Sequence, residues 1–587
     1  MKFRRLSSWD DPQNCVGLVF FSQLLEEMLF DFSLDTYKAS VMHTGLLCAE
    51  AVETIQEIEN GNIRTPNIWH VTAELCSSFE KDRVAQALVP LPASAIFPAL
   101  KNQKNQLKEV ETVLRLLCVH MSRQKYRQKN EELLGIEIEG RQSLSEIRRL
   151  TRSYITALVS LGFDQRHIRA VASKFFHGPG RIAGATAVKD FFLLFPVDPM
   201  EFNVIFRVDG IFEHLADALS PIGLTISRVL PEGIDLKKYP DFNPDANSRL
   251  FAIAEKVSAR DVHSARSAAE YRLKLCSTLL TLFHHKENPA WRPECIVHTV
   301  AGDTYTQISS PINAMHKCAD LLQPVASKRL GLLLNEFSLE KNSFDKFIRS
   351  AQLHSMALVS NAYENQILNL WISLESLIPS ETRDEDSSNI EHIVQSLIPF
   401  LNVGYLERLL GNLVKDLLRW NNKATKNALR GIDGRKFAER LSKLMVLSDH
   451  AEQLAALEGQ LGDFHLLRDR FEYLKVLVSN PSHVIAALDA HRTRLEWQIR
   501  RIYRTRNIIV HSGRTPSHTK SLIEHTHDYL DIVLSVLVNL ASTPKSITSV
   551  AQGFKYVELR YELYYKALSA KELAFDASNI DNLLFSK

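Results

Sequence analysis

The chain has 587 residues, 45% of them hydrophobic and 24% charged, which is typical of a globular protein long enough for several domains. Its formal net charge of +2 excludes an overall basic surface, so any contact with nucleic acid has to come from a local patch. The 7 cysteines include no C-x-x-C pair, and the sequence has neither a signal peptide nor an apolar run of the about 20 residues that span a bilayer, so we expect a cytoplasmic protein with reduced thiols and no membrane segment.

The first 150 residues predict a mostly helical N-terminal region. Apolar residues recur at helical spacing in the stretches 20–32, 42–58 and 107–128. Glycines and prolines between these stretches mark loops. The pattern predicts helices but indicates no activity for the region 1–150.

Residues 151–339 predict a small mixed α+β domain. Short runs rich in β-forming residues predict strands at 191–195, 202–206, 224–230 and 295–300. A helical pattern at 211–219 lies between two of these runs, which makes a β-α-β unit.

Residues 340–587 predict an all-helical bundle, so the fold class is mainly α. Asn480-Pro481-Ser482 is a turn and cap that precedes a long helical stretch. Its apolar residues recur at helical spacing: Leu488, Leu495, Ile499, Ile502 and Ile509.

The end of this stretch carries the most informative motif, an arginine followed by four residues and a histidine, Arg506 and His511. Histidine moves protons near neutral pH because its free pKa is about 6.5, and the planar arginine fork fits a phosphate. The spacing alone is weak evidence, since Arg115 and His120, and Arg349 and His354, have it too. Only Arg506 is followed directly by an asparagine, Asn507, and only this motif ends at a helix-stop signal, Gly513.

The surroundings of the motif are basic, and we expect Arg500, Arg504 and Arg514 to contact RNA. Arg506 falls on the apolar stripe, where an unpaired charge costs several kcal/mol, so it needs a carboxylate, an oxygen-rich partner or a ligand. Arg506 and His511 are separated by roughly 140° around the helix axis, from about 100° per residue. Two facing copies build a compact site more easily than one, which predicts a symmetric homodimer.

At this point the chain resembles the Apea-like group of HEPN domains, found in bacterial anti-phage proteins. The resemblance covers about residues 340–570 and rests on RNIIVH and on the stretch Leu370-Trp371-Ile372-Ser373-Leu374-Glu375-Ser376-Leu377-Ile378-Pro379, which is similar to the W-x-x-L-E-x-L helix of that group. It implies a helical bundle, a homodimer and metal-independent cleavage of host or phage RNA, tRNA among the candidates, to 2',3'-cyclic phosphate and 5'-OH ends. It also implies abortive infection set off by a phage-encoded trigger, without a cofactor.

Carried onto this sequence, the resemblance gives each site residue a role. Arg506 holds the phosphate, His511 handles protons and Asn507 matches the polar residue usual after the arginine. Glu375 matches the acidic residue of the first helix, and we interpret it as the partner that positions Arg506 or Asn507. The N-terminal half is then the sensor or the brake.

Other interpretations stay open. His511 can be a structural histidine, favoured by the negative end of the helix dipole, and Arg506 can be an ion-pair partner of Glu375 and nothing more. The whole domain can be a non-catalytic HEPN module that binds a nucleotide, RNA or a partner protein. The sequence contains no P-loop and no H-E-x-x-H, so we predict no metal ligands, and we expect His527 at the surface.

Overall fold

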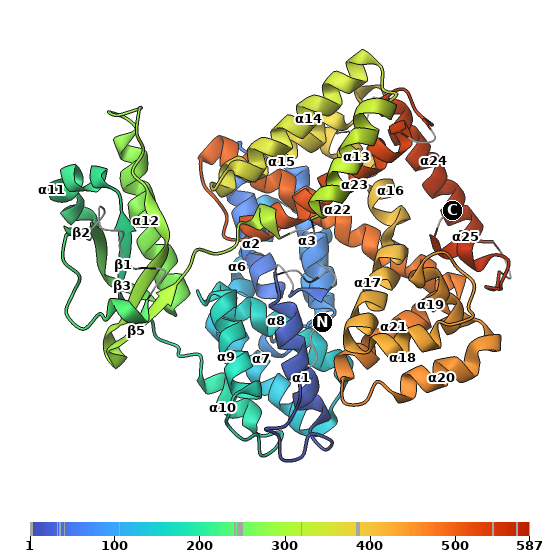
Figure 1. Ribbon diagram of the computed structural model, residues 1–587, viewed down its shortest axis with the longest axis horizontal. Coiled ribbons are helices and arrows are strands. Elements are labelled where there is room, and N and C mark those ends of the chain that lie inside the picture. The colour runs from blue at the N-terminus through green and yellow to red at the C-terminus, as the bar shows by residue number, and fades with distance from the viewer. Residues whose placement is uncertain are drawn as a thin grey trace.

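The computed structural model describes residues 4–31, 33, 37–39, 42–104, 106–239, 242, 250–317, 320–382, 388–542, 545–570 and 573–585. These residues are mainly helical, with one small antiparallel sheet, so the predicted fold class holds at this level (Figure 1). No helix in the described ranges is long and apolar enough to cross a membrane.

The described residues of the N-terminal part form helices, with one isolated β-bridge between Trp9 and Ile182. The helices are α1 (Val16–Met28), α2 (Thr44–Glu59), α3 (Pro66–Phe79), α4 (Arg83–Leu88), α5 (Ala93–Lys101), α6 (Leu107–His120), α7 (Arg123–Ile136), α8 (Leu144–Ser160), α9 (Gln165–His177) and α10 (Ala187–Leu193). The domain boundary expected near residue 150 falls inside α8, and α9 and α10 continue the same helical layer.

The strand predicted at 191–195 is wrong, because this segment forms the end of α10 and the turn after it. Phe191 and Phe195 are fully buried and pack edge-to-face, with ring centroids 5.4 Å apart. Phe191 also meets the ring of Phe21 of α1 at 5.7 Å. Aromatic residues favour strands locally, but here burial of one helical face against α1 outweighs that preference.

The sheet domain lies between residues 200 and 308. Its elements are β1 (Met200–Val208), α11 (Ala216–Leu219), β2 (Leu224–Ser227), β3 (Phe251–Ala259), α12 (Val262–Leu280), β4 (Trp291–Thr299) and β5 (Thr304–Ile308). The strands are antiparallel in the order β2-β3-β1-β4-β5, so β3 separates the two strands of the predicted β-α-β unit. The strands predicted at 202–206, 224–230 and 295–300 are confirmed as β1, β2 and β4.

The two faces of the sheet have separate cores because side chains alternate along a strand. Phe202, Val204 and Phe206 of β1 pack on one face, which α12 covers with Ala265 and further small or apolar residues. Ile205 points to the opposite face. The sheet domain stands to one side of the helical body in Figure 1, joined to it by two connecting segments.

The C-terminal part is again helical. Its helices are α13 (Gln323–Glu336), α14 (Lys341–Val359), α15 (Tyr363–Leu377), α16 (Asn389–Val403), α17 (Tyr405–Trp420), α18 (Asn422–Ala428), α19 (Phe437–Val446), α20 (Ala451–Gly459), α21 (His465–Val478), α22 (Pro481–Ser512), α23 (Thr519–Ser542), α24 (Val550–Leu568) and α25 (Ile580–Phe585). A single continuous apolar core joins them to the N-terminal helices.

Helix α22 is the centre of this arrangement. It packs against α15, α16 and α21 of its own part of the chain and also against α3 from the N-terminal part. In Figure 1 the N-terminal helices α2 and α3 lie directly beside α22 and α23. The helix that carries the motif is therefore held between the two helical regions.

Candidate functional site

Helix α22 begins and ends where the sequence predicts. The Asn480 side chain accepts a hydrogen bond of 2.8 Å from the backbone N–H of Ser482, and Pro481 occupies the first helical position. Gly513 ends the helix at a φ of +66°, and its N–H donates to the carbonyl of Ile509 at 3.1 Å. A residue with a side chain is strained at that φ, so glycine fixes the end of the helix two residues after His511.

Arg506 is partly buried and lacks an acidic partner in the described part of the chain. Its Nη1 donates to Oδ1 of Asn507 at 3.0 Å, and its Nε is buried without a hydrogen-bond partner. The apolar residues around it on the stripe, from Leu488 to Ile509, are all buried, as predicted. Because the Nε is enclosed by protein, a phosphate would have to bind the terminal nitrogens of this guanidinium, which have no acidic partner among the described residues.

His511 lies on the last turn of α22 and is exposed. Within the described ranges it makes no hydrogen bond, ion pair or ring contact. One turn earlier, Asn507 is only 7% exposed, and its amide oxygen holds the guanidinium of Arg506. The motif thus combines an imidazole open to solvent with an oriented arginine.

Glu375 does not contact the motif, in contrast to the role predicted for it. Its Oε2 accepts a hydrogen bond of 3.1 Å from Nε1 of Trp371, and its Oε1 accepts one of 2.9 Å from Nδ2 of Asn389. Neither Arg506 nor Asn507 bonds to it. The interpretation of Arg506 as an ion-pair partner of Glu375 is wrong for the same reason.

The direction of α15 explains this result. Thr515, just beyond α22, donates a hydrogen bond to Glu364 at the start of α15. About two turns later, the Trp371 ring packs against that of Tyr503, with centroids 5.7 Å apart. The two helices are therefore antiparallel, and Glu375 lies a turn beyond Trp371, toward the beginning of α22 and away from Arg506.

Of the three basic residues expected to contact RNA, two are buried and one is exposed, and all three are in ion pairs. Arg500 is 6% exposed and forms an ion pair with Glu391 of α16, and Arg504 is 3% exposed and binds Glu50 of α2 at 2.9 Å. Arg514 is more exposed and pairs with two glutamates of α2, Glu53 and Glu57. Contact with RNA by these arginines requires that the ion pairs open.

A buried ion-pair cluster links the N-terminal helices to the motif helix. It consists of Glu50, Glu74, Arg501 and Arg504. Arg501 makes three hydrogen bonds of 3.0 to 3.1 Å to the Glu50 carboxylate and one of 2.6 Å to Glu74. Burial favours the neutral form of Glu50, but the two guanidinium groups outweigh burial and hold its pKa below its usual range. Glu50 is therefore charged at neutral pH, and no sequence signal pairs it with arginines more than 450 residues away.

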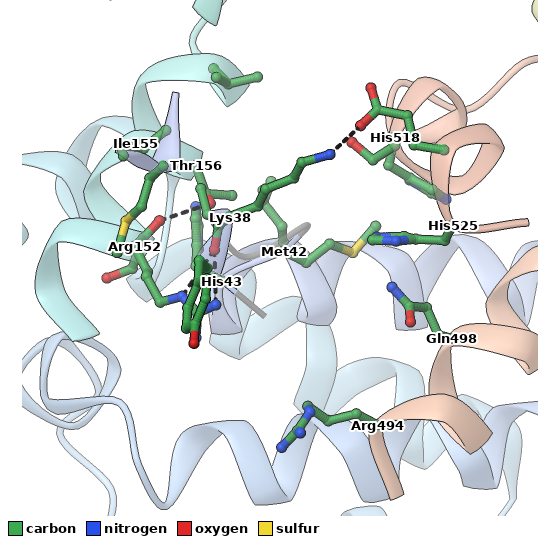
Figure 2. A pocket seen from close by; sticks show the side chains of 18 of the residues that line it. Lys38, Met42, His43, Arg152, Ile155, Thr156, Arg494, Gln498, His518 and His525 are labelled. Atoms are coloured by element: carbon green, nitrogen blue, oxygen red, sulfur yellow. Dashed lines mark hydrogen bonds and ion pairs between the residues drawn. The ribbon is translucent and has the colours of Figure 1, made fainter. Parts of the chain in front are cut away.

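A cleft of about 1740 Å³ separates the N-terminal helices from α17, α22 and α23. Figure 2 shows Arg494 and Gln498 of α22 and His525 of α23 on one side, and Arg152 and Thr156 of α8 on the other. Burial, reinforced by the positive charges of Arg148, Arg494 and Arg470, lowers the pKa of Arg152 to about 10. Arg152 therefore stays charged at neutral pH near Arg494 on the wall of the cleft, while Arg148 and Arg470 are paired with Asp469 and Glu27 of the same lining.

His43, which lines the same cleft, makes stability depend on pH (Figure 2). Its ring is 3% exposed, stacks on Tyr126 at 3.8 Å and has no hydrogen-bond partner for either nitrogen in the described structure. Burial, with a smaller effect of Arg123, lowers its pKa from the ordinary 6.5 to about 3. Between pH 6.5 and pH 3 the unfolded state therefore binds a proton at His43 and the folded state does not. The contribution of neutral His43 to the free energy of unfolding is complete above pH 6.5 and is lost as the pH falls toward 3.

We expect His43→Phe, which keeps the ring stacked on Tyr126, to remove the part of the pH dependence of stability that His43 causes. Between pH 7.5 and pH 5.0 the wild type should lose about 2 kcal/mol more of its unfolding free energy than the variant, at 1.36 kcal/mol per pH unit below 6.5. Chemical denaturation at the two pH values measures the difference, with the exposed His483→Phe as control. An equal pH dependence in the wild type and His43→Phe would contradict the prediction.

Comparison of the chain with models of protein families, with curated proteins and with solved structures found no match in any of the three.

Proposed function

We propose that this protein is a metal-independent endoribonuclease of HEPN type, and that Arg506 and His511 of two copies form its active site. One observation carries the proposal. His511 is exposed on the last turn of α22, and Arg506 on the same helix is held by Asn507 with a buried Nε that has no partner. A proton-transfer group and a phosphate-binding group with spare donors are what metal-free phosphodiester cleavage requires.

The reaction uses the 2'-OH of the RNA as the nucleophile. His511 removes the 2'-OH proton as a general base, and the histidine of the second copy protonates the leaving 5'-oxygen. The 2'-oxygen forms a bond to phosphorus as the bond to the 5'-oxygen breaks, which leaves a 2',3'-cyclic phosphate and a 5'-OH. Arg506 stabilises the charge that develops on the phosphorane oxygens. DNA is not a substrate because it lacks the 2'-OH.

The buried ion-pair cluster gives the N-terminal half a role as a brake. In this arrangement α2 and α3 hold Arg501 and Arg504 of the motif helix, while Glu53 and Glu57 hold Arg514. A trigger that separates these helices releases several cations next to Arg506 and His511 for RNA. Together with the resemblance to Apea-like HEPN domains, this arrangement extends the proposal to an antiviral role in the cytoplasm, in which a phage-encoded signal releases cleavage of host or phage RNA, tRNA included.

The proposed dimer can be tested by cross-linking at Val510, which is exposed and adjacent to His511 in the sequence. If two copies meet at the ends of α22, Val510→Cys should form a disulfide-linked dimer under mild oxidation, because such a bond needs Cα atoms within about 7 Å. Non-reducing electrophoresis measures it. Background is low, since the described cysteines are buried apart from the partly exposed Cys118, while Cys318 lies outside the described residues. A dimer in light scattering without this cross-link would place the interface elsewhere.

The direct test is cleavage of total RNA and of purified tRNA in the presence of EDTA. We expect fragments with 2',3'-cyclic phosphate and 5'-OH ends, identified by their resistance to ligation until the ends are treated enzymatically. Because the described conformation is braked, the assay includes Glu50→Gln, which opens the ion-pair cluster. Intact RNA with the wild type and with Glu50→Gln would refute the nuclease proposal.

That negative outcome would favour a second candidate function, a HEPN module that binds a phosphate-bearing ligand or a partner without cutting RNA. The observation in its favour is the wall of the cleft, where Arg152 and Arg494 lie near one another.

A further inference from the structure

A second cluster of functional side chains lies on α14 and α23, apart from the motif. His354 belongs to α14, and His527 and Asp531 lie four residues apart on one face of α23. The two Nε2 atoms are 2.8 Å apart, and they lie 3.7 Å and 3.4 Å from the carboxylate oxygens of Asp531. His527 is buried, not at the surface as the sequence suggested.

These distances match the spacing between ligands of one metal ion. Zinc–nitrogen and zinc–oxygen bonds of about 2.0 to 2.2 Å in a tetrahedron put neighbouring ligand atoms roughly 3.3 to 3.6 Å apart. The three observed separations of 2.8, 3.4 and 3.7 Å lie on both sides of that range. The two separations that involve Asp531 lie near that range, while the two Nε2 atoms, which share a hydrogen bond of 2.8 Å, have to move slightly apart to hold one ion.

We infer that His354, His527 and Asp531 bind one divalent transition-metal ion of the zinc class. Two imidazole nitrogens and one carboxylate suit zinc and its neighbours, whereas magnesium and calcium prefer oxygen ligands only. Three protein ligands leave a coordination position open. Asp531 also lines the large cleft, which gives the ion a route of entry.

The ion fastens α14 to α23 and so acts on the part of the bundle that follows the motif helix. α15 lies against both α14 and α23, and α23 also packs on α22. This role is independent of the proposed cleavage chemistry, which uses no metal. The metal site also gives a function to His354. Arg349 and His354 have the same spacing as Arg506 and His511, but no role in the proposed cleavage.

Metal binding can be measured on the full chain purified without a polyhistidine tag. We expect chelator-treated wild type to take up one equivalent of Zn²⁺ by isothermal titration calorimetry and elemental analysis, with a higher Tm, and to ignore Mg²⁺. His354→Gln and Asp531→Asn, both at partly exposed positions, should bind zinc at least about 100-fold more weakly, since even the loss of a residue that only hydrogen-bonds to a ligand costs about 10- to 100-fold. His483→Gln, exposed on α22, is the control.

The proposal is overturned if the wild type binds no zinc, or if His354→Gln and Asp531→Asn bind it as tightly as the wild type. Folding of each variant is checked by its circular dichroism, and only folded variants are compared. The RNA cleavage assay in EDTA reads out the other proposal separately, because zinc binding and cleavage can each fail without the other.

Discussion

Replacement of His511 by alanine is expected to lower RNA cleavage by about 10²- to 10⁴-fold, the usual contribution of general acid–base catalysis. Arg506→Ala should lower it by about 10²- to 10³-fold, as loss of one donor to a developing oxyanion does. His511 is exposed and bonds to nothing in the described structure, so its loss should change the unfolding free energy by less than about 0.5 kcal/mol. Initial cleavage rates of a labelled RNA, measured at equal dimer concentration, test both values.

The chain offers a matched control for this experiment. Arg115 and His120 have the same spacing on α6, where Arg115 pairs with Glu111 and is well exposed. The double variant Arg115→Ala/His120→Ala should cleave at the wild-type rate. Full activity of folded, dimeric His511→Ala would remove the imidazole from the mechanism, and equal losses in the control pair would point to a general structural effect.

Glu50→Gln is expected to weaken the contact between the N-terminal helices and α22 by about 3 kcal/mol, because removing one partner of a buried ion pair leaves the other charge uncompensated. Arg504 loses its carboxylate, and Arg501 retains only Glu74. Chemical denaturation gives the change in unfolding free energy. The brake further predicts that cleavage by this less stable variant is faster than by the wild type.

Glu496→Gln is the matched control for Glu50→Gln, since it removes the same charge from the exposed i,i+4 pair with Arg492 on the same helix. Surface pairs of this kind contribute about 0.3 to 0.5 kcal/mol, so stability and cleavage should stay near wild type. A Glu50→Gln protein that is destabilised but no more active would leave the ion-pair cluster a purely structural role.

Much of the fold follows from the local sequence. The start and stop of α22 are specified by Asn480, Pro481 and Gly513, whose effects act over a few residues. The buried stripe from Leu488 to Ile509 follows from helical spacing in the same way. The segment 191–195 does not follow from the local sequence. Its phenylalanines favour a strand locally, and the packing of Phe191 on Phe21 of α1 stabilises the helix instead.

The sequence by itself therefore determined a mainly helical chain and the place of Arg506, Asn507 and His511 on one helix end. Only the tertiary structure decided that Arg500 and Arg504 are buried against glutamates, that Glu375 turns away from Arg506, and that His354 meets His527 across 173 residues. The physical reason is the distance along the chain over which each interaction acts. Capping and periodicity act within a few turns of one helix, whereas ion pairs and ligand clusters depend on which helix faces come together in space, and that is set by burial over the whole core.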